Sequence, residues 1–189
     1  MTPRLNATHI GTATDILEIN GINFLTDPFF SPAGTSWDKG RIVLKTTRTT
    51  LTPSAASSST AGTSSRGPDF GKGHDGLPNA IYFSGDTVYI EELDTIADRY
   101  HICAAVMNLG NAHAPVTDEP GAPLLQITMG GRDGAKLFRA LKADVLVPMH
   151  YELWGYFTQF GEDIKRAFKE EGISEKSCWL RRDERVKVL

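Results

Sequence analysis

The chain has 189 residues, of which 40% are hydrophobic and 23% are charged, a composition that can build one packed core and excludes a largely disordered protein. Lys and Arg number 20 against 23 Asp and Glu, which gives a formal net charge of -3. From the length we expect residues 1–189 to form a single domain. Because the chain lacks the basic excess of proteins that bind phosphate backbones, we expect no nucleic-acid partner.

The number of cysteines and the length of the apolar runs indicate the cellular compartment of the protein. Cys103 and Cys178 are too few for a disulfide scaffold or an all-cysteine zinc site, which favours a reducing compartment. No apolar stretch approaches the roughly 20 residues of a transmembrane segment, and the first residues, MTPRLNATHIG, lack the hydrophobic region of a signal peptide. We therefore expect a cytoplasmic protein with no transmembrane segment.

The first local pattern is a β-hairpin between Thr14 and Asp27. Two β-rich runs flank Asn20-Gly21, the pair that best tolerates the positive φ angles of a type I′ turn. The second run ends in Asp27-Pro28, where proline stops strand pairing and leaves a carboxylate at a strand end. Asp27 is therefore a candidate site residue, with an Asx turn at this corner as the structural alternative.

A change of composition follows. From residue 46 to residue 66, Ser and Thr make up 13 of 21 positions, and the glycines continue to residue 76. Such a segment cannot bury enough apolar surface to order itself, so residues 46–76 are predicted to be a flexible Ser/Thr/Gly-rich segment. A phosphorylated regulatory tract is the functional alternative.

The rest of the chain alternates between strand and helix patterns. Residues 80–84 and 101–109 are apolar strands around a helical pattern at 88–100, an arrangement typical of a βαβ unit. The remaining elements are predicted in the order helix 128–142, strand 144–149, helix 161–171 and a final strand pair, 177–180 with 185–189.

Two polar residues directly follow buried strands, Asp86 in FSGDT and His150 in VPMHYE. Because the carboxyl ends of parallel strands lie along one edge of a sheet, we expect them to meet, and carboxylate and imidazole are ligands of zinc and related ions. The structural alternative makes Asp86 the N-cap of a helix beginning near Val88 and gives His150 a hydrogen bond within a loop. A third interpretation makes Asp86 a phospho-acceptor at a strand end.

Three runs together, THIGTATDILEINGINFLTDPFFS, IYFSGDT and ADVLVPMHYELWGYF, resemble the metallo-β-lactamase superfamily. The resemblance is to the branch similar to ascorbate-phosphate lactonase and the phospholipase D that acts on N-acyl phosphatidylethanolamine, and it covers nearly everything except the Ser/Thr-rich segment. It implies an α/β fold, an αββα sandwich, with one or two zinc ions at an edge where loops of both sheets meet. There the metal-bound hydroxide hydrolyses the substrate.

Matched by position, the resemblance makes Asp86 a metal-bridging ligand and His150 a ligand of the second metal. It makes Asp27 a residue that orients these ligands without binding the metal itself. The family's HxHxDH motif is absent from this sequence, and the third-motif histidine has no clear equivalent. The Ser/Thr-rich segment occupies the place of that motif, so the chain is expected to be a truncated member of the family with an internal deletion.

A catalytic zinc usually has three protein ligands, so Asp86 and His150 need at least one more. The nearest candidate by sequence is His74 in GKGHDGL, because flanking glycines would let it approach. The other histidines are assigned to strands or a loop and lack ligand spacing: His9, His101 and His113. Most aromatic residues after His150 are predicted to pack in the core, with Tyr151 or Trp154 as residues of an apolar substrate pocket.

These inferences support two hypotheses of different classes. The first is a zinc-dependent hydrolase acting on an ester, lactone or phosphodiester, including small-molecule or lipid-like esters, with Asp86 and His150 at its catalytic centre. The second, motivated by the missing histidine cluster, is a pseudoenzyme that acts as a binding or interaction protein. A homo-oligomer would then cover the apolar surface exposed by the lost strands.

Overall fold

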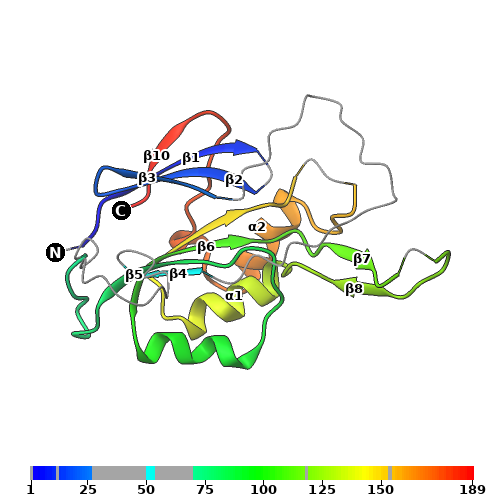
Figure 1. Cartoon of the computed structure of the whole chain (residues 1–189), viewed down its shortest axis with the longest axis horizontal. Helices are drawn as coiled ribbons and strands as arrows, with labels where there is room; N and C mark the ends of the chain where they lie inside the picture. Colours follow the sequence, from blue (N-terminus) through cyan, green and yellow to red (C-terminus); the bar gives the residue numbers. More distant parts are fainter. Residues whose placement is uncertain (1, 12, 27–49, 54–69, 118, 153–154) are drawn as a thin grey trace, which may run out of the picture.

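The computed structural model describes residues 2–11, 13–26, 50–53, 70–117, 119–152 and 155–189, and these form two four-stranded β-sheets, a two-stranded sheet and one layer of helices (Figure 1). The first sheet is antiparallel, in the order β10-β1-β2-β3. Its strands are β1 (Leu5–Gly11), β2 (Thr14–Ile19), β3 (Ile22–Leu25) and β10 (Arg185–Lys187).

The hairpin predicted at Asn20-Gly21 is confirmed. Ile19 pairs with Ile22 across the turn, and both turn residues have positive φ, 50° at Asn20 and 86° at Gly21. Both central residues of a type I′ turn require this backbone conformation, and the turn fixes the register of β2 against β3.

The second sheet has the order β4-β5-β6-β9, in which β5, β6 and β9 run parallel and β4 pairs antiparallel with β5. Its strands are β4 (Thr50–Pro53), β5 (Asn79–Phe83), β6 (His101–Asn108) and β9 (Val145–Met149). The β5-to-β6 crossover contains the 3₁₀ helix η1 (Glu91–Asp98), and the β6-to-β9 crossover contains α1 (Gly131–Ala140). The parallel strand–helix–strand unit expected from the sequence is therefore present, and its helix begins at Glu91.

Side chains alternate between the two faces of the second sheet. On one face, Ile81, Val106 and Val147 pack with residues of β1 and β2 and form the inner core between the two sheets. On the other face, Tyr82 and Met107 pack under the helices and form the outer core, together with Phe168 of α2 (Gly161–Glu170). Strands buried on both faces explain the almost continuously apolar sequence of β6.

The layers are thus sheet, sheet and helix. The described residues place no helix on the outer face of the first sheet, where the predicted αββα sandwich has its second helical layer. The mixed α/β class and the sandwich of two sheets agree with the prediction. Within the described ranges, no helix is long and apolar enough to cross a membrane.

The C-terminal strands differ from the prediction. Strand β10 pairs with β1, and Ser177 forms an isolated bridge with Leu146, so the predicted pair of 177–180 with 185–189 is wrong. The short 3₁₀ helix η2 (Ser174–Lys176) precedes this bridge. A further hairpin, β7 (His113–Pro115) with β8 (Leu124–Gln126), projects from the sheet end where a loop was expected.

Only part of the segment predicted to be flexible lies within the described residues. Residues 50–53 form β4, and residues 70–76 lead into β5 through a turn closed by a bridge between Lys72 and Pro78. Residues 46–49 and 54–69 lie outside the described ranges.

Candidate functional site

Three polar side chains gather at the carboxyl ends of the three parallel strands. Asp86 follows β5, Asn108 is the last residue of β6, and His150 comes directly after β9. Each strand end therefore contributes one residue, as the parallel order of the sheet requires.

Asp86 and His150 lie side by side. Nδ1 of His150 is 3.0 Å from Oδ1 of Asp86, and the Asn108 side-chain amide donates a hydrogen bond of 2.7 Å to the same oxygen. His150 is 5% exposed, and its buried Nδ1 makes no hydrogen bond with the described residues. A buried ring nitrogen without a hydrogen bond beside a carboxylate fits a pair of ligands that share an ion.

The surroundings keep Asp86 ionised. Burial raises the pKa of its carboxyl, but the contact with His150 and the hydrogen bond from Asn108 outweigh burial and bring the pKa below its ordinary value. An ionised carboxylate is the form that binds metal.

The backbone around His150 is held in an uncommon conformation. His150 has a φ of 55°, in the left-handed region, and its ring packs edge-on against Phe157 with centroids 5.0 Å apart. The backbone at Gly110 lies close to the His150 carbonyl oxygen, and glycine makes this close approach possible, since a Cβ there would lie 2.9 Å from that oxygen. The backbone N–H groups of Thr158 and Gln159 both donate to the Gly110 carbonyl and tie the segment after His150 to the end of β6. Such local strain is typical of functional sites.

The structural alternative for Asp86 fails on geometry. The helix after β5 begins at Glu91 with Ile90 as its N-cap, so Asp86 does not cap it. Sequence reasoning missed Asn108, because an asparagine that ends an apolar run carries no motif.

The first sheet contributes a second polar pair near this edge. Nδ1 of His9 is 2.7 Å from Oδ1 of Asp15, a carboxylate with no exposed side-chain surface. His9, His150 and Tyr151 line one small cavity of about 10 Å³, roughly the space of one water molecule. Tyr151, predicted as a pocket residue, also packs its ring 5.6 Å from Trp179, and burial raises the pKa of its hydroxyl.

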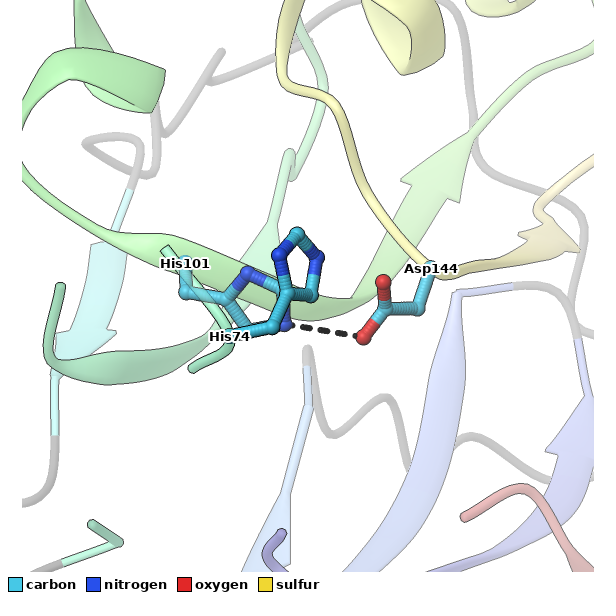
Figure 2. Close-up of side chains that lie close together, drawn as sticks. All are labelled: His74, His101 and Asp144. Carbon is cyan, nitrogen blue, oxygen red and sulfur yellow. Dashed lines mark hydrogen bonds and ion pairs between the residues drawn. The ribbon is translucent and has the colours of Figure 1, made fainter. Parts of the chain in front are cut away.

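Of the remaining predicted residues, Asp27 and Trp154 are outside the described residues. His74 does not join Asp86 and His150: it lies beside His101 and Asp144, at the amino ends of β6 and β9 (Figure 2). Among the described residues, this is the one group of three or more such side chains whose ligand atoms all lie within 4.8 Å of one another. Sequence spacing did not indicate this group, because its three residues come from separate segments.

No protein-family model matches the chain. A metal-dependent hydrolase from Pyrobaculum islandicum is 29% identical over 100 residues, which are 53% of this chain and 37% of that protein. A metal-dependent hydrolase from Pyrococcus horikoshii is 31% identical over 87 residues, which are 46% of this chain and 32% of that protein. The chain thus spans about a third of the length of these relatives.

A solved structure has the same fold over almost the whole chain. It is Igni18, a metallo hydrolase from the archaeon Ignicoccus hospitalis, with a TM-score of 0.59 and 14% sequence identity over 97% of this chain and 98% of that protein. The chain therefore has the fold of a metallo hydrolase and is similar in sequence to metal-dependent hydrolases.

Proposed function

We propose that the protein is a metal-dependent hydrolase of the metallo-β-lactamase type, with its metal at the carboxyl edge of the second sheet. The observation that carries the proposal is the pair formed by Asp86 and the buried Nδ1 of His150, 3.0 Å apart at neighbouring strand ends. The similarity to metal-dependent hydrolases and the shared fold support it.

The residues present fit a divalent ion of the zinc class. Asp86 and His150 offer an ionised carboxylate and a ring nitrogen without a hydrogen bond, which are ligand types that zinc accepts. When bound, such an ion activates water and stabilises the negative charge that develops during hydrolysis. Asn108 orients the Asp86 carboxylate, while Phe157 and Gly110 hold the His150 ring and backbone in place.

We infer an ester, lactone or phosphodiester as the substrate. All three react through a centre at which oxygen gains negative charge, and one or two zinc ions would serve each of them. Tyr151 lines the small cavity beside His150, which supports the proposal that its partly buried ring contacts an apolar part of a substrate bound at this edge.

A second candidate function is a pseudoenzyme that binds a partner. The observation that favours it is the sequence itself, which contains no HxHxDH motif. The described residues offer two ligands at this edge, against the three protein ligands that a catalytic zinc usually has.

Zinc content and hydrolysis decide between the two. The whole chain of residues 1–189, loaded with zinc, is assayed against a p-nitrophenyl ester, a lactone and bis-p-nitrophenyl phosphate. We expect hydrolysis of at least one class, and a drop of at least about 100-fold in kcat/KM for Asp86→Asn and for His150→Asn. Asparagine tolerates the positive φ at position 150, so that variant removes the ring without adding backbone strain.

The matched control is Asp98→Asn, an exposed carboxylate on η1, which we expect to leave hydrolysis unchanged. If the zinc-loaded protein hydrolyses none of the three substrates, or if both site variants keep full activity, the hydrolase proposal fails and the binding protein is preferred.

A further inference from the structure

A second cluster of possible ligands lies at the opposite end of the parallel strands. His74 belongs to the turn before β5, His101 is the first residue of β6, and Asp144 directly precedes β9. One ligand atom from each lies within 4.8 Å of the other two, and Figure 2 shows the side chains converging. We call these three residues the amino-edge cluster.

We propose that the amino-edge cluster binds a divalent metal ion of the zinc class. Two imidazoles and one carboxylate are a ligand set that zinc accepts, and three protein ligands leave one position open. Nε2 of His101 is already 3.0 Å from Oδ2 of Asp144, close to the separation of about 3.3 Å expected between two ligands on a tetrahedral zinc. The His74 ring, whose centroid is 4.6 Å from that of His101, needs only a small movement to join them.

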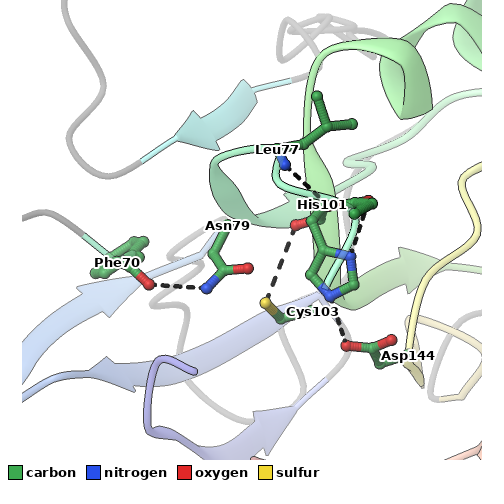
Figure 3. Close-up of polar contacts among 7 residues, drawn as sticks. Phe70, Leu77, Asn79, His101, Cys103 and Asp144 are labelled. Atoms are coloured by element: carbon green, nitrogen blue, oxygen red, sulfur yellow. Dashed lines mark hydrogen bonds and ion pairs between the residues drawn. The ribbon is translucent and has the colours of Figure 1, made fainter. Parts of the chain in front are cut away.

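The contacts of His101 argue for a cation. Its Nδ1 is 3.2 Å from Oδ2 of Asp75, while its Nε2 faces Asp144 (Figure 3). A neutral imidazole has one N–H for these two carboxylates, so the contacts are completed either by an imidazolium, which donates to both, or by an ion between Nε2 and Asp144. With the ion bound, Asp75 plays the part of the carboxylate that usually orients a metal-binding histidine.

His101, the buried member of the cluster, is held in place before any ion binds. The His101 side chain is 6% exposed, and Gly73 packs so closely on it that a Cβ at Gly73 would lie 2.1 Å from its Cγ. The Leu77 N–H donates a hydrogen bond of 3.0 Å to Oδ1 of Asp75 and is the main cause that lowers the pKa of this carboxyl, with His101 lowering it further. The turn from Gly73 to Leu77 thus fixes Asp75 against the ring.

The cluster is open to solvent on one side. His74 and Asp144 help to line an open cavity of about 450 Å³ whose other lining residues include Lys142 and Lys176. The cavity gives an ion and a further ligand a route to the open position. The two lysines favour water or a small anion there over another cation.

The amino-edge cluster is separate from the pair of Asp86 and His150. His101 and Asn108 begin and end the eight-residue strand β6, so the two places lie on the order of 23 Å apart and share no ligand. The proposal therefore stands or falls independently of the hydrolase function.

Zinc binding in the Asp86→Asn background tests the proposal, because that change removes a ligand from the other edge. The full-length variant is stripped with a chelator and titrated with zinc alone, and with cobalt(II), whose visible absorption reports tetrahedral coordination. We expect the stripped variant to bind about one equivalent of zinc. Adding the exposed His74→Gln should abolish this binding, and Asp75→Asn should weaken it by about 10–100-fold.

The matched control is His113→Gln in the same background, which changes a histidine of β7 far from the cluster and should bind zinc unchanged. Circular dichroism of each metal-free variant checks that it is folded. The proposal is overturned if the Asp86→Asn protein binds no zinc, or if the added His74→Gln leaves its zinc affinity and the cobalt spectrum unaltered. In that case His101 is a structural clamp between Asp75 and Asp144.

Discussion

At the scale of single residues, Asp86 gathers the contacts of all three parallel strand ends. Its Oδ1 receives the Asn108 amide and lies 3.0 Å from Nδ1 of His150, and Asn108 is in turn anchored where its backbone N–H donates to Oγ of Ser84. Ser84 therefore positions Asp86 through Asn108, and one carboxylate couples the stability of this edge to pH.

The first prediction concerns Asp86→Asn in the metal-free protein. The folded pKa of Asp86 is lower than its ordinary value of 3.8, so the carboxylate stabilises the fold above that pH and loses this contribution as the pH falls through the folded value. The side chain is 42% exposed, so we expect the variant to be less stable at pH 7 by under about 1 kcal/mol. Urea unfolding from about pH 2 to about pH 7, which brackets the ordinary pKa of a carboxyl group, measures the difference in unfolding free energy between the variant and the wild type.

The difference between wild type and Asp86→Asn should close as the pH falls below 3.8. Asp98→Asn, with its exposed carboxylate, serves as the comparison and should show no such trend. A difference that stays constant with pH would show that the variant acts through lost packing.

At the scale of elements, the end of β6 packs closely against the segment that follows β9. Gly110 has a φ of 105°, and a Cβ there would meet the His150 carbonyl oxygen at 2.9 Å and the Phe157 ring at 3.0 Å. The glycine thus sets the distance between the end of β6 and the segment after β9, which carries His150.

The second prediction is that Gly110→Ala displaces His150. The added methyl group meets backbone atoms and a packed ring, and alanine is disfavoured at this φ, so we expect a loss of about 2–4 kcal/mol in unfolding free energy. Gly121→Ala is the matched control, since Gly121 has a similar φ of 83° but no atom within 4 Å of its Cβ position. The control should lose only about 1 kcal/mol. Equal losses of unfolding free energy for Gly110→Ala and Gly121→Ala, measured by thermal or urea unfolding, would mean that the close approach at Gly110 does not contribute to the cost of the added methyl group.

The elements that could be predicted are those with local chemistry. The Asn20-Gly21 turn forms a hairpin because both residues accept positive φ, and the approach of Asp86 to His150 follows from the rule that parallel strands end at one edge. The amino-edge cluster could not be found in this way, because His74 and His101 are brought to Asp144 by the start of two strands and a turn, with no fixed spacing.

The C-terminal strand shows the same limit. The run 185–189 has the alternation of a strand, but nothing local says which edge it will pair with, and in the structure it closes the first sheet against β1. The partner of an edge strand is decided by long-range packing, which a pattern within the strand does not encode.

At the scale of the whole molecule, two cores share one sheet. The inner core joins β1 and β2 to β5, β6 and β9, and the outer core joins the opposite face of these same strands to α1 and α2. Loss of the inner core would remove packing from the second sheet as well. This arrangement predicts that the two sheets and the helices unfold as one cooperative unit.

The third prediction tests whether the molecule unfolds as one unit, with one large-to-small side-chain substitution in each core. Leu5 is fully buried in the inner core and Phe168 in the outer core, so we expect losses of about 2–5 kcal/mol for Leu5→Ala and about 3–5 kcal/mol for Phe168→Ala. Each variant should show one urea transition, at the same midpoint by far-UV circular dichroism and by tryptophan fluorescence. A leucine on the exposed face of β8, Leu124→Ala, is the control and should change stability by less than about 0.5 kcal/mol.

Hydrogen exchange gives the same test at the level of elements. If the molecule is one unit, Leu5→Ala lowers the protection of the slowest amides in α2 as much as in β1, although Leu5 does not touch α2 across the second sheet. If Leu5→Ala instead splits the transition in two and leaves the protection of α2 unchanged, the first sheet is a separate folding unit. The edge that carries His9, Asp86 and His150 would then be a junction between two units rather than one rigid site.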